Sequence, residues 1–213
     1  LLRRRARGTL DDALGGYYLT LVDSLSTLAL MGERQRFLDG IDAIRNISFD
    51  RDVAVSVFEA NIRVLGGLLS AHQLASYLLP SDYDDLLLHK AQDLANRLLP
   101  AFATPTGAPV HRINLKKGLI RGQTTETCPA AAGTFLLEMG LLSRLTGQPV
   151  YERAAMNAIY ALWSRRSSLG LLGAMFDTES GLWTYRHSGI GAGLDSYFEY
   201  LAKGYLLLDD DRL

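Results

Sequence analysis

The sequence predicts an all-α fold, a toroid of helical hairpins, from three observations. Apolar residues recur at helical spacing in about seven segments, which follow one another in pairs with the more apolar member first. The first helix of each pair places a carboxylate in its apolar stripe, at Asp23, Glu59, Glu138 and Asp195. Glycine-rich connectors separate the later pairs. Since a charge in an apolar stripe is costly unless it is paired or used, these carboxylates indicate a shared polar centre surrounded by helices.

The first two pairs follow from apolar periodicity and its breakers. A helix is expected over Tyr17–Met31, where Gly32 supplies the stop, and a shorter amphipathic partner over Phe37–Ile44. The second pair is expected over Val57–Leu79 and Tyr83–Leu99. A proline follows each of these two segments and cannot continue a helix, so both ends are well defined.

The later elements alternate with two long connectors. The first connector, Ala101–Thr125, is rich in proline and glycine and is expected to form a loop or a β-hairpin. Helices should resume at about Glu126, with an apolar helix over Pro129–Leu145 and an amphipathic partner over Val150–Ser164. The second connector is expected over Leu169–Gly193.

Within the second connector, the segment Met175–Trp183 resembles two short strands around a turn. The last helix is expected over Leu194–Leu208. The chain therefore predicts about three and a half helical hairpins, whose inner carboxylates point toward the axis while the connectors line one rim, where a ligand could bind.

Composition excludes several classes of function. Lys and Arg number 22 against 23 Asp and Glu, a formal net charge of -1, so no global field would attract nucleic acid or an acidic membrane. No apolar run is long enough to span a bilayer. The chain begins with leucine and shows no secretory signal peptide, which suggests a piece of a longer protein.

Two further motifs concern covalent chemistry. Cys128 is the only cysteine, so we expect it to be structural or to pair with a cysteine outside this chain. The sequence Asn46-Ile47-Ser48 is an N-glycosylation sequon, and it is equally compatible with an unmodified surface turn.

Glu59 and Arg63 lie four residues apart and share a helix face, the spacing of an ordinary salt bridge. Their neighbours are strongly apolar, which favours a buried site over a solvated pair. Hydrolysis of a glycosidic bond requires two carboxyl groups, one as acid and one to activate water or to attack. Glu59 is therefore a candidate for that chemistry.

Asp195 and Glu199 form a second acidic pair, after a flexible glycine-rich lead. Asp195 has two readings, a helix cap or a site acid. Asp23 and Glu138 each carry a weaker signal, since either could be a satisfied core acid. The histidines lack zinc-site spacing, so a zinc site is not expected.

Trp183 and Tyr185 in the second connector could stack on sugar rings or anchor a hairpin. The glycine-rich Ser188–Gly193 is not a dinucleotide fingerprint, because no βαβ unit surrounds it.

Five ordered motifs, from about Leu14 to the C-terminus, resemble glycoside hydrolase family 47, the class I α-1,2-mannosidases. The motifs are Leu19–Leu25, Val57–His72, Arg97–Phe102, Leu142–Gly147 and Gly193–Leu201. Glu126–Cys128 and Ser188–Asp195 most resemble the branch of ER degradation-enhancing α-mannosidase-like proteins (EDEM).

The resemblance implies an (α/α)7 barrel, of which residues 1–213 would be about half of the catalytic domain. It implies a bound calcium ion and inverting hydrolysis of terminal α-1,2-linked mannose from high-mannose N-glycans, in ER quality control and degradation. Glu59 matches the family's general acid, which would act through water, and Asp195 matches another essential acid. Arg63 matches a positioning residue, and Asp23, Glu138 and Glu199 are expected to contribute to substrate binding.

The chain also departs from the family pattern. Ser26 stands where a second aspartate is usual, Gly193 replaces an arginine, and Ala131 replaces an acid of the trimming enzymes. The other catalytic carboxylate and the threonine that ligates calcium are expected beyond Leu213, so these residues alone are predicted to be inactive. The resemblance implies an ER-lumen or secretory location, N-glycan substrates and a Cys or oxidoreductase partner for Cys128. The alternative is a lectin-like module that binds mannose without turnover.

Overall fold

The computed structural model describes residues 15–16 and 19–209. Its helices are α1 (Leu19–Leu30), α2 (Arg34–Arg45), α3 (Val57–Glu59), the π-helix η1 (Ala60–Leu65), α4 (Gly66–Leu78), α5 (Leu86–Leu98), the 3₁₀ turn η2 (Leu99–Phe102), α6 (Pro129–Gly133), α7 (Leu136–Thr146), α8 (Val150–Trp163) and α9 (Asp195–Leu208). Its strands are β1 (Ala54–Ser56), β2 (Arg112–Asn114), β3 (Glu126–Thr127), β4 (Met175–Asp177) and β5 (Trp183–Tyr185).

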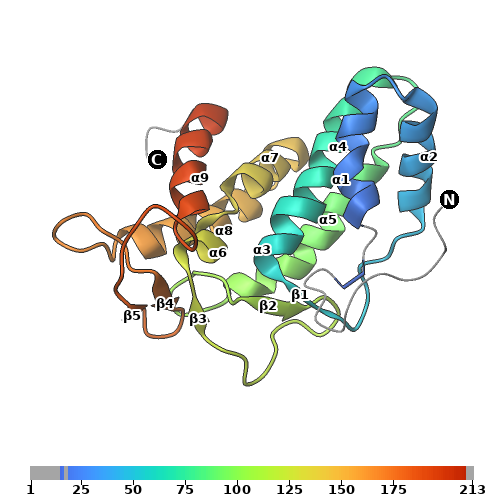
Figure 1. The fold of residues 1–213 in the computed structure, drawn as a ribbon. Coiled ribbons are helices and arrows are strands. Elements are labelled where there is room, and N and C mark those ends of the chain that lie inside the picture. The colour runs from blue at the N-terminus through green and yellow to red at the C-terminus, as the bar shows by residue number, and fades with distance from the viewer. Residues whose placement is uncertain (1–14, 17–18, 210–213) are drawn as a thin grey trace.

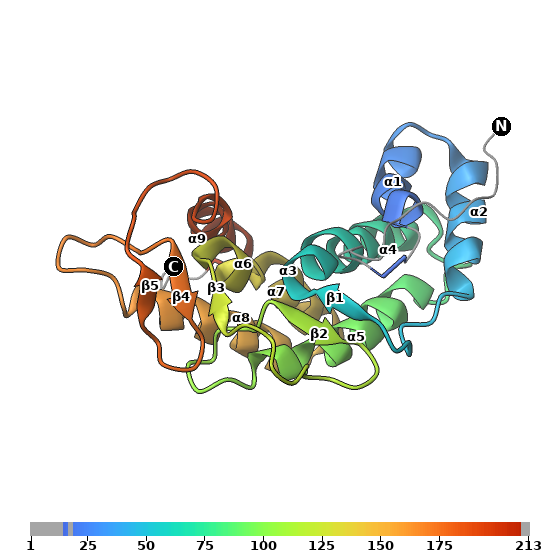
Figure 2. The same ribbon diagram turned by 60° about the horizontal axis from the view of Figure 1, so that its bottom comes forward.

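The helices form an arc of hairpins (Figure 1). Helices α1, α4, α7 and α9 follow one another in contact along the inner side of the arc, and α2, α5 and α8 pack outside α1, α4 and α7. Figures 1 and 2 place the α1–α2 hairpin at one end of the arc and α9 at the other. The predicted helical hairpins are thus confirmed, and the described residues form an open arc of two helical layers.

The two rims of the arc differ. Short turns join α1 to α2, α4 to α5 and α7 to α8 at one rim, whereas the long connectors that lead into α3, α6 and α9 gather at the other. All five strands lie on these connectors, at the lower edge of the arc in Figure 1. The connector rim therefore surrounds the N-terminal ends of the inner helices, as the sequence predicted.

The strands form two small antiparallel sheets. The hairpin expected around Met175–Trp183 is confirmed as β4–β5. Strand β3 pairs with the free edge of β4, where Thr127 lies opposite Phe176. The first connector differs from a self-contained hairpin, because β2 pairs with β1 and sets Val55 opposite Ile113. Neither β1 nor β3 was predicted, since strands of two or three residues are too short to show alternation.

Three predicted helices differ from the observed ones in helix type, continuity or first residue. The segment predicted over Val57–Leu79 is helical, but Ala60–Leu65 within it is a π-helix. The segment predicted over Pro129–Leu145 breaks at Thr134, whose φ of -98° and ψ of 67° are not helical, and it follows the strand β3 at the position where helix was expected. Helix α5 begins at Leu86, because Asp85 adopts a left-handed conformation. The first residues of the helix predicted from Tyr17 lie outside the described part of the chain.

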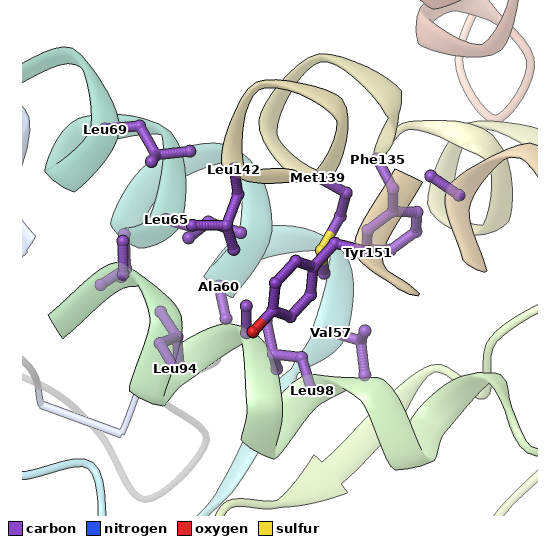
Figure 3. Packing of buried hydrophobic residues seen from close by; sticks show 14 of the residues in the cluster. Val57, Ala60, Leu65, Leu69, Leu94, Leu98, Phe135, Met139, Leu142 and Tyr151 are labelled. Carbon is purple, nitrogen blue, oxygen red and sulfur yellow. The ribbon is translucent and has the colours of Figure 1, made fainter. Parts of the chain in front are cut away.

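The core fills the space between the inner and outer helices (Figure 3). Leu65 on η1, Met139 on α7 and Leu98 on α5 are each 0% exposed. The inner and outer layers are therefore packed closely against each other. The ring of Tyr151 on α8 enters the same cluster, and its hydroxyl donates a hydrogen bond of 2.8 Å to Oδ1 of Asn96 on α5. This packing fixes the helix ends that carry the predicted site residues.

Candidate functional site

Glu59 is placed by a strand that turns directly into a helix. β1 ends at Ser56, whose Oγ accepts a hydrogen bond of 3.3 Å from the backbone N–H of Glu59 and so caps α3. The backbone N–H of Val57 donates to the carbonyl of His111 at 3.0 Å, which carries the β1–β2 pairing into the helix start. Glu59 therefore lies in the first helical turn at the connector rim, where the helix dipole favours a negative charge.

Glu59 and Arg63 form an ion pair across the junction of α3 and η1. Arg63 Nε donates to Glu59 Oε2, and this hydrogen bond, the charge of Glu59 and the charge of Asp23 together raise the pKa of Arg63. The Glu59 side chain is 29% exposed and that of Arg63 is 44% exposed. The expected buried site is thus wrong in detail, because the apolar neighbours point into the core while this face of the helix reaches solvent.

Asp23 approaches this pair because α1 and α4 pack closely. A Cβ atom on Gly67 would lie 2.9 Å from Cγ1 of Val22, a separation that only glycine permits. Asp23, the residue after Val22, is exposed, and its negative charge helps to raise the pKa of Arg63. The structure therefore brings Asp23, Arg63 and Glu59 into one polar group.

Asp195 is the first residue of α9 and is exposed. Its Oδ1 accepts a hydrogen bond of 2.8 Å from the backbone N–H of Ser196, and the N-cap position belongs to Leu194 without a side-chain cap. The carboxylate therefore does not cap the helix in the usual manner. The backbone N–H of Ala130 donates to the carbonyl of Gly193 at 2.8 Å, which holds the start of α9 against α6.

Glu199 lies one turn further along α9, where its carboxylate pairs with Lys203 on the exposed face of the helix. Its contact with Lys203 is the arrangement of an ordinary surface pair, which contributes little to stability. A role for Glu199 in substrate binding stays a prediction.

Glu138 has a different environment, because it is only 8% exposed. Its Oε2 accepts a hydrogen bond of 2.8 Å from Nδ2 of Asn61 on η1, and its Oε1 accepts one of 2.7 Å from the hydroxyl of Tyr200 on α9. Burial raises the pKa of Glu138, and the hydrogen bonds from Tyr200 and Asn61 oppose that rise. Burial, together with the neighbouring Glu138, also raises the pKa of Tyr200 above its usual value.

The break between α6 and α7 completes this network. Because Thr134 is not helical, its carbonyl is free to accept a second hydrogen bond from Asn61 Nδ2, at 3.1 Å. The hydroxyl of Thr134 donates to Oγ of Ser196 at 2.9 Å. Asn61 lies two residues after Glu59 and Ser196 one residue after Asp195, so the network ties the two helix starts that carry the candidate acids.

Asn61, Thr134 and Tyr200 were not predicted as site residues. The signal that could have identified Asn61 is its place in an apolar run beside Glu59, since a buried amide requires partners. The Ser56-x-x-Glu59 spacing of a capping box would also have marked Ser56 as the N-cap of the helix that carries Glu59. Thr134 and Tyr200 gave no comparable signal, because their roles depend on where the helix breaks.

The aromatic residues of the second connector act as anchors in this structure. Trp183 Nε1 donates to the carbonyl of Arg165 at 2.7 Å, and its ring meets Phe176 edge-on. Trp183 also lines a cavity of about 470 Å³ beneath the β4–β5 hairpin, and none of the candidate carboxylates lines that cavity. Tyr185 is exposed and stacks on His187. Stacking of either ring on a sugar stays a prediction.

The described residues hold no cluster of acidic, histidine or cysteine side chains that would bind a metal ion by itself. Within residues 15–16 and 19–209, no three His, Cys, Asp or Glu side chains gather closely enough to share a metal ion. A calcium ion would therefore require ligands other than a cluster of these side chains. In the same part of the chain, no helix has the length and hydropathy needed to cross a membrane.

Most enzymes that hydrolyse glycosidic bonds use a pair of carboxyl groups, and the arc carries Glu59 and Asp195 at the helix starts of one rim. The family model for glycosyl hydrolase family 47 matches residues 4–213. The chain therefore belongs to glycosyl hydrolase family 47.

Individual relatives agree with this membership. The chain is 50% identical over 208 residues to alpha-mannosidase I MNS4 of Arabidopsis thaliana, covering 95% of this chain and 33% of that protein. It is 47% identical over 218 residues to human ER degradation-enhancing alpha-mannosidase-like protein 3, covering 97% of this chain and 23% of that protein. The chain thus spans about a third or less of the length of these relatives.

A solved structure shows the same fold. The alpha-1,2-mannosidase from Trichoderma reesei superposes with a TM-score of 0.82 at 33% sequence identity, over 92% of this chain and 43% of that chain. The arc of hairpins therefore corresponds to somewhat less than half of that enzyme chain.

Proposed function

We propose that the protein hydrolyses terminal α-1,2-linked mannose from high-mannose N-glycans on glycoproteins, in ER quality control and degradation. Membership of glycosyl hydrolase family 47, together with the partly exposed Glu59 at the connector rim, carries this proposal. Relatives named as ER degradation-enhancing alpha-mannosidase-like proteins support an ER-lumen or secretory location. A thiol partner for Cys128 stays a prediction, since the chain has no second cysteine.

In this proposal, Glu59 is the general acid. A carboxyl group at the connector rim is open to solvent, so it can deliver its proton through a water molecule to the glycosidic oxygen as the bond to the departing sugar breaks. Arg63 holds one oxygen of Glu59 and so orients the other toward the rim. Asp195 contributes a second carboxylate at the same rim, at the start of α9.

Inversion requires a further carboxylate to activate water on the opposite face of the sugar. We propose that this base and the ligands of the calcium ion lie outside residues 1–213, and that these residues alone are inactive. Calcium, when bound, would hold hydroxyl groups of the mannose. Neither role is assigned to a side chain described above.

The test uses the full-length protein and a high-mannose N-glycan. Mass spectrometry should show stepwise loss of hexose from glycans that end in α-1,2-linked mannose, and none from a glycan that lacks this linkage. NMR during the first minutes should show β-mannose as the initial product, the outcome of inversion. Binding of the glycan without release of mannose would overturn the enzyme proposal in favour of a lectin-like module.

A further inference from the structure

We propose that Asn46 is a site of N-linked glycosylation, a modification that the proposed mannosidase activity does not require. Asn46-Ile47-Ser48 has the acceptor pattern, with isoleucine rather than proline at the middle position. It is the only such pattern in the 213 residues. The inference rests on the proposed secretory location, because the transfer takes place there.

The fold presents this segment in a form that can carry a glycan. Asn46 follows the last residue of α2 and its backbone N–H donates to the carbonyl of Ile44, so the helix ends at the acceptor. Residues 46–50 then follow without helix or strand, as the chain leaves α2 for β1. A glycosylated asparagine requires such an irregular surface segment.

Burial alternates along the segment and fixes which side chains face solvent. Ile47 is 7% exposed and Phe49 is 2% exposed, whereas Asn46 and Ser48 are both exposed. Lys90 Nζ on α5 donates to the carbonyl of Ile47 at 2.5 Å, which holds the segment against the outer helix. A glycan on Asn46 would therefore extend into solvent without displacing a core residue.

Asn46 and Glu59 lie toward the same rim, but on helices of different layers of the arc. Helix α2 packs on the outer side of α1 at one end of the arc (Figure 2). Glu59 belongs to α3, which continues through η1 into the inner helix α4. The neighbouring Arg45 pairs with Asp84, with 2.9 Å between Nη1 and Oδ2. A glycan on Asn46 would therefore not remove the partner of this guanidinium. A glycan on Asn46 would therefore start from the outer layer of the arc.

The donor in the transfer is an oligosaccharide linked to a lipid diphosphate. A bond forms between Nδ2 of Asn46 and C1 of the first sugar. The bond between that carbon and the diphosphate breaks, Nδ2 loses one proton, and the lipid diphosphate leaves. No oxidant or reductant takes part.

The experiment uses the full-length protein directed into the secretory pathway of a eukaryotic host by a cleavable leader. Trypsin should release the peptide Asn46–Arg51 by cleavage after Arg45 and after Arg51. Before digestion, the denatured protein is treated with peptide N-glycosidase in heavy-oxygen water, because the enzyme acts on an internal asparagine. The tryptic peptide should then contain a labelled aspartate at position 46. Asn96 is exposed but lacks a hydroxyl residue two positions later, so it should remain unlabelled.

Two variants make the result specific. Ser48→Ala should abolish the label while leaving Asn46 in place, and Ser48→Thr should restore it. A peptide recovered mainly as unmodified Asn46 from the leader-directed protein would overturn the inference. Mannose release by Asn46→Gln should equal that of the unchanged protein. An unchanged protein that releases mannose but carries no label at position 46 would overturn only the glycosylation site. A labelled but inactive protein would overturn only the proposed function.

Discussion

At the scale of single residues, the buried carboxylate of Glu138 differs most from the other predicted acids. Glu59 and Asp195 reach solvent at the rim, whereas Glu138 accepts hydrogen bonds from two different helices inside the protein. A buried carboxylate with both oxygens engaged is costly to leave half-paired. Replacing Glu138 is therefore expected to change the stability of the fold first.

Replacing Glu138 with glutamine should change how stability depends on pH. Burial raises the pKa of Glu138 above its reference value of 4.5, so the folded protein binds this proton more strongly than the unfolded chain does. The stabilising contribution of that proton is present below the unfolded pKa and is lost as pH rises through the folded pKa. The variant, which cannot titrate, should therefore gain stability relative to the unchanged protein over that window.

Denaturant unfolding at a series of pH values measures this difference. Glu126→Gln, at an exposed position on β3, is the matched control and should show no comparable trend. If the difference between Glu138→Gln and the unchanged protein did not vary with pH, the raised pKa would be contradicted.

Residue-scale prediction from sequence succeeded where spacing decides contact. Glu59 and Arg63 are four apart on one helical face, and they do pair. The exposure of that pair could not be predicted, because it depends on which side of the helix faces the rim. The network around Asn61 could not be predicted either, since the carbonyl that it uses becomes free only where the helix breaks at Thr134.

At the scale of elements, two helices of the inner layer approach each other closely at Gly133 on α6. A Cβ atom there would lie 2.3 Å from Cδ2 of Tyr197 on α9, which is fully buried. The hydroxyl of Tyr197 donates to the carbonyl of Ile159 at 3.1 Å, so the ring is held at both ends. The ring therefore has little freedom to move away.

Gly133→Ala should destabilise the protein by about 1–3 kcal/mol, the usual cost of overpacking a filled core. Gly189→Ala is the control, because its Cβ would have no neighbour within 4 Å and its backbone is not left-handed. Thermal unfolding of both variants measures the effect. Equal melting temperatures for the two would show that α6 and α9 do not pack as described.

Asp177 joins the two long connectors. It accepts hydrogen bonds from the backbone N–H of Ser180 at 2.6 Å and from the hydroxyl of Thr125 at 2.5 Å. These bonds hold the pKa of Asp177 at about 2, below its reference value of 3.8. Its contribution is therefore present above the unfolded pKa and is lost as pH falls through about 2.

Asp177→Asn should cost about 1 kcal/mol at neutral pH, since the hydrogen bonds lose their charge assistance. The cost should shrink as the pH of the unfolding experiment is lowered from about 4 toward 2. A cost that stayed constant over that range would argue against an ionised Asp177 as the acceptor at the β4–β5 turn.

Element-scale prediction was sound for long helices and for the β4–β5 hairpin. It missed β1 and β3, whose pairing partners lie far along the chain: Ile113 is 58 residues after Val55, and Phe176 is 49 residues after Thr127. Local propensity cannot report such pairing. The break at Thr134 was missed for a similar reason, because the surrounding residues are apolar and small throughout.

At the scale of the whole molecule, the arc leaves apolar side chains exposed at its two ends. Leu206 on α9 is 78% exposed, and Leu30 at the end of α1 is 79% exposed. The alternation of inner and outer helices was predictable, because the inner member of each pair is the more apolar. The close approach of neighbouring helices was not, since it depends on tertiary contacts such as those at Gly67 and Gly133.

The central claim is that Glu59 supplies acid catalysis to an α-mannosidase of glycosyl hydrolase family 47. The most direct test is the rate of mannose release from a high-mannose N-glycan by the full-length protein and its Glu59→Gln variant. General acid catalysis contributes about 10²–10⁴-fold, so the variant should lose that much in kcat while unfolding at the same temperature. A Glu59→Gln protein that releases mannose at the unchanged rate would contradict the claim.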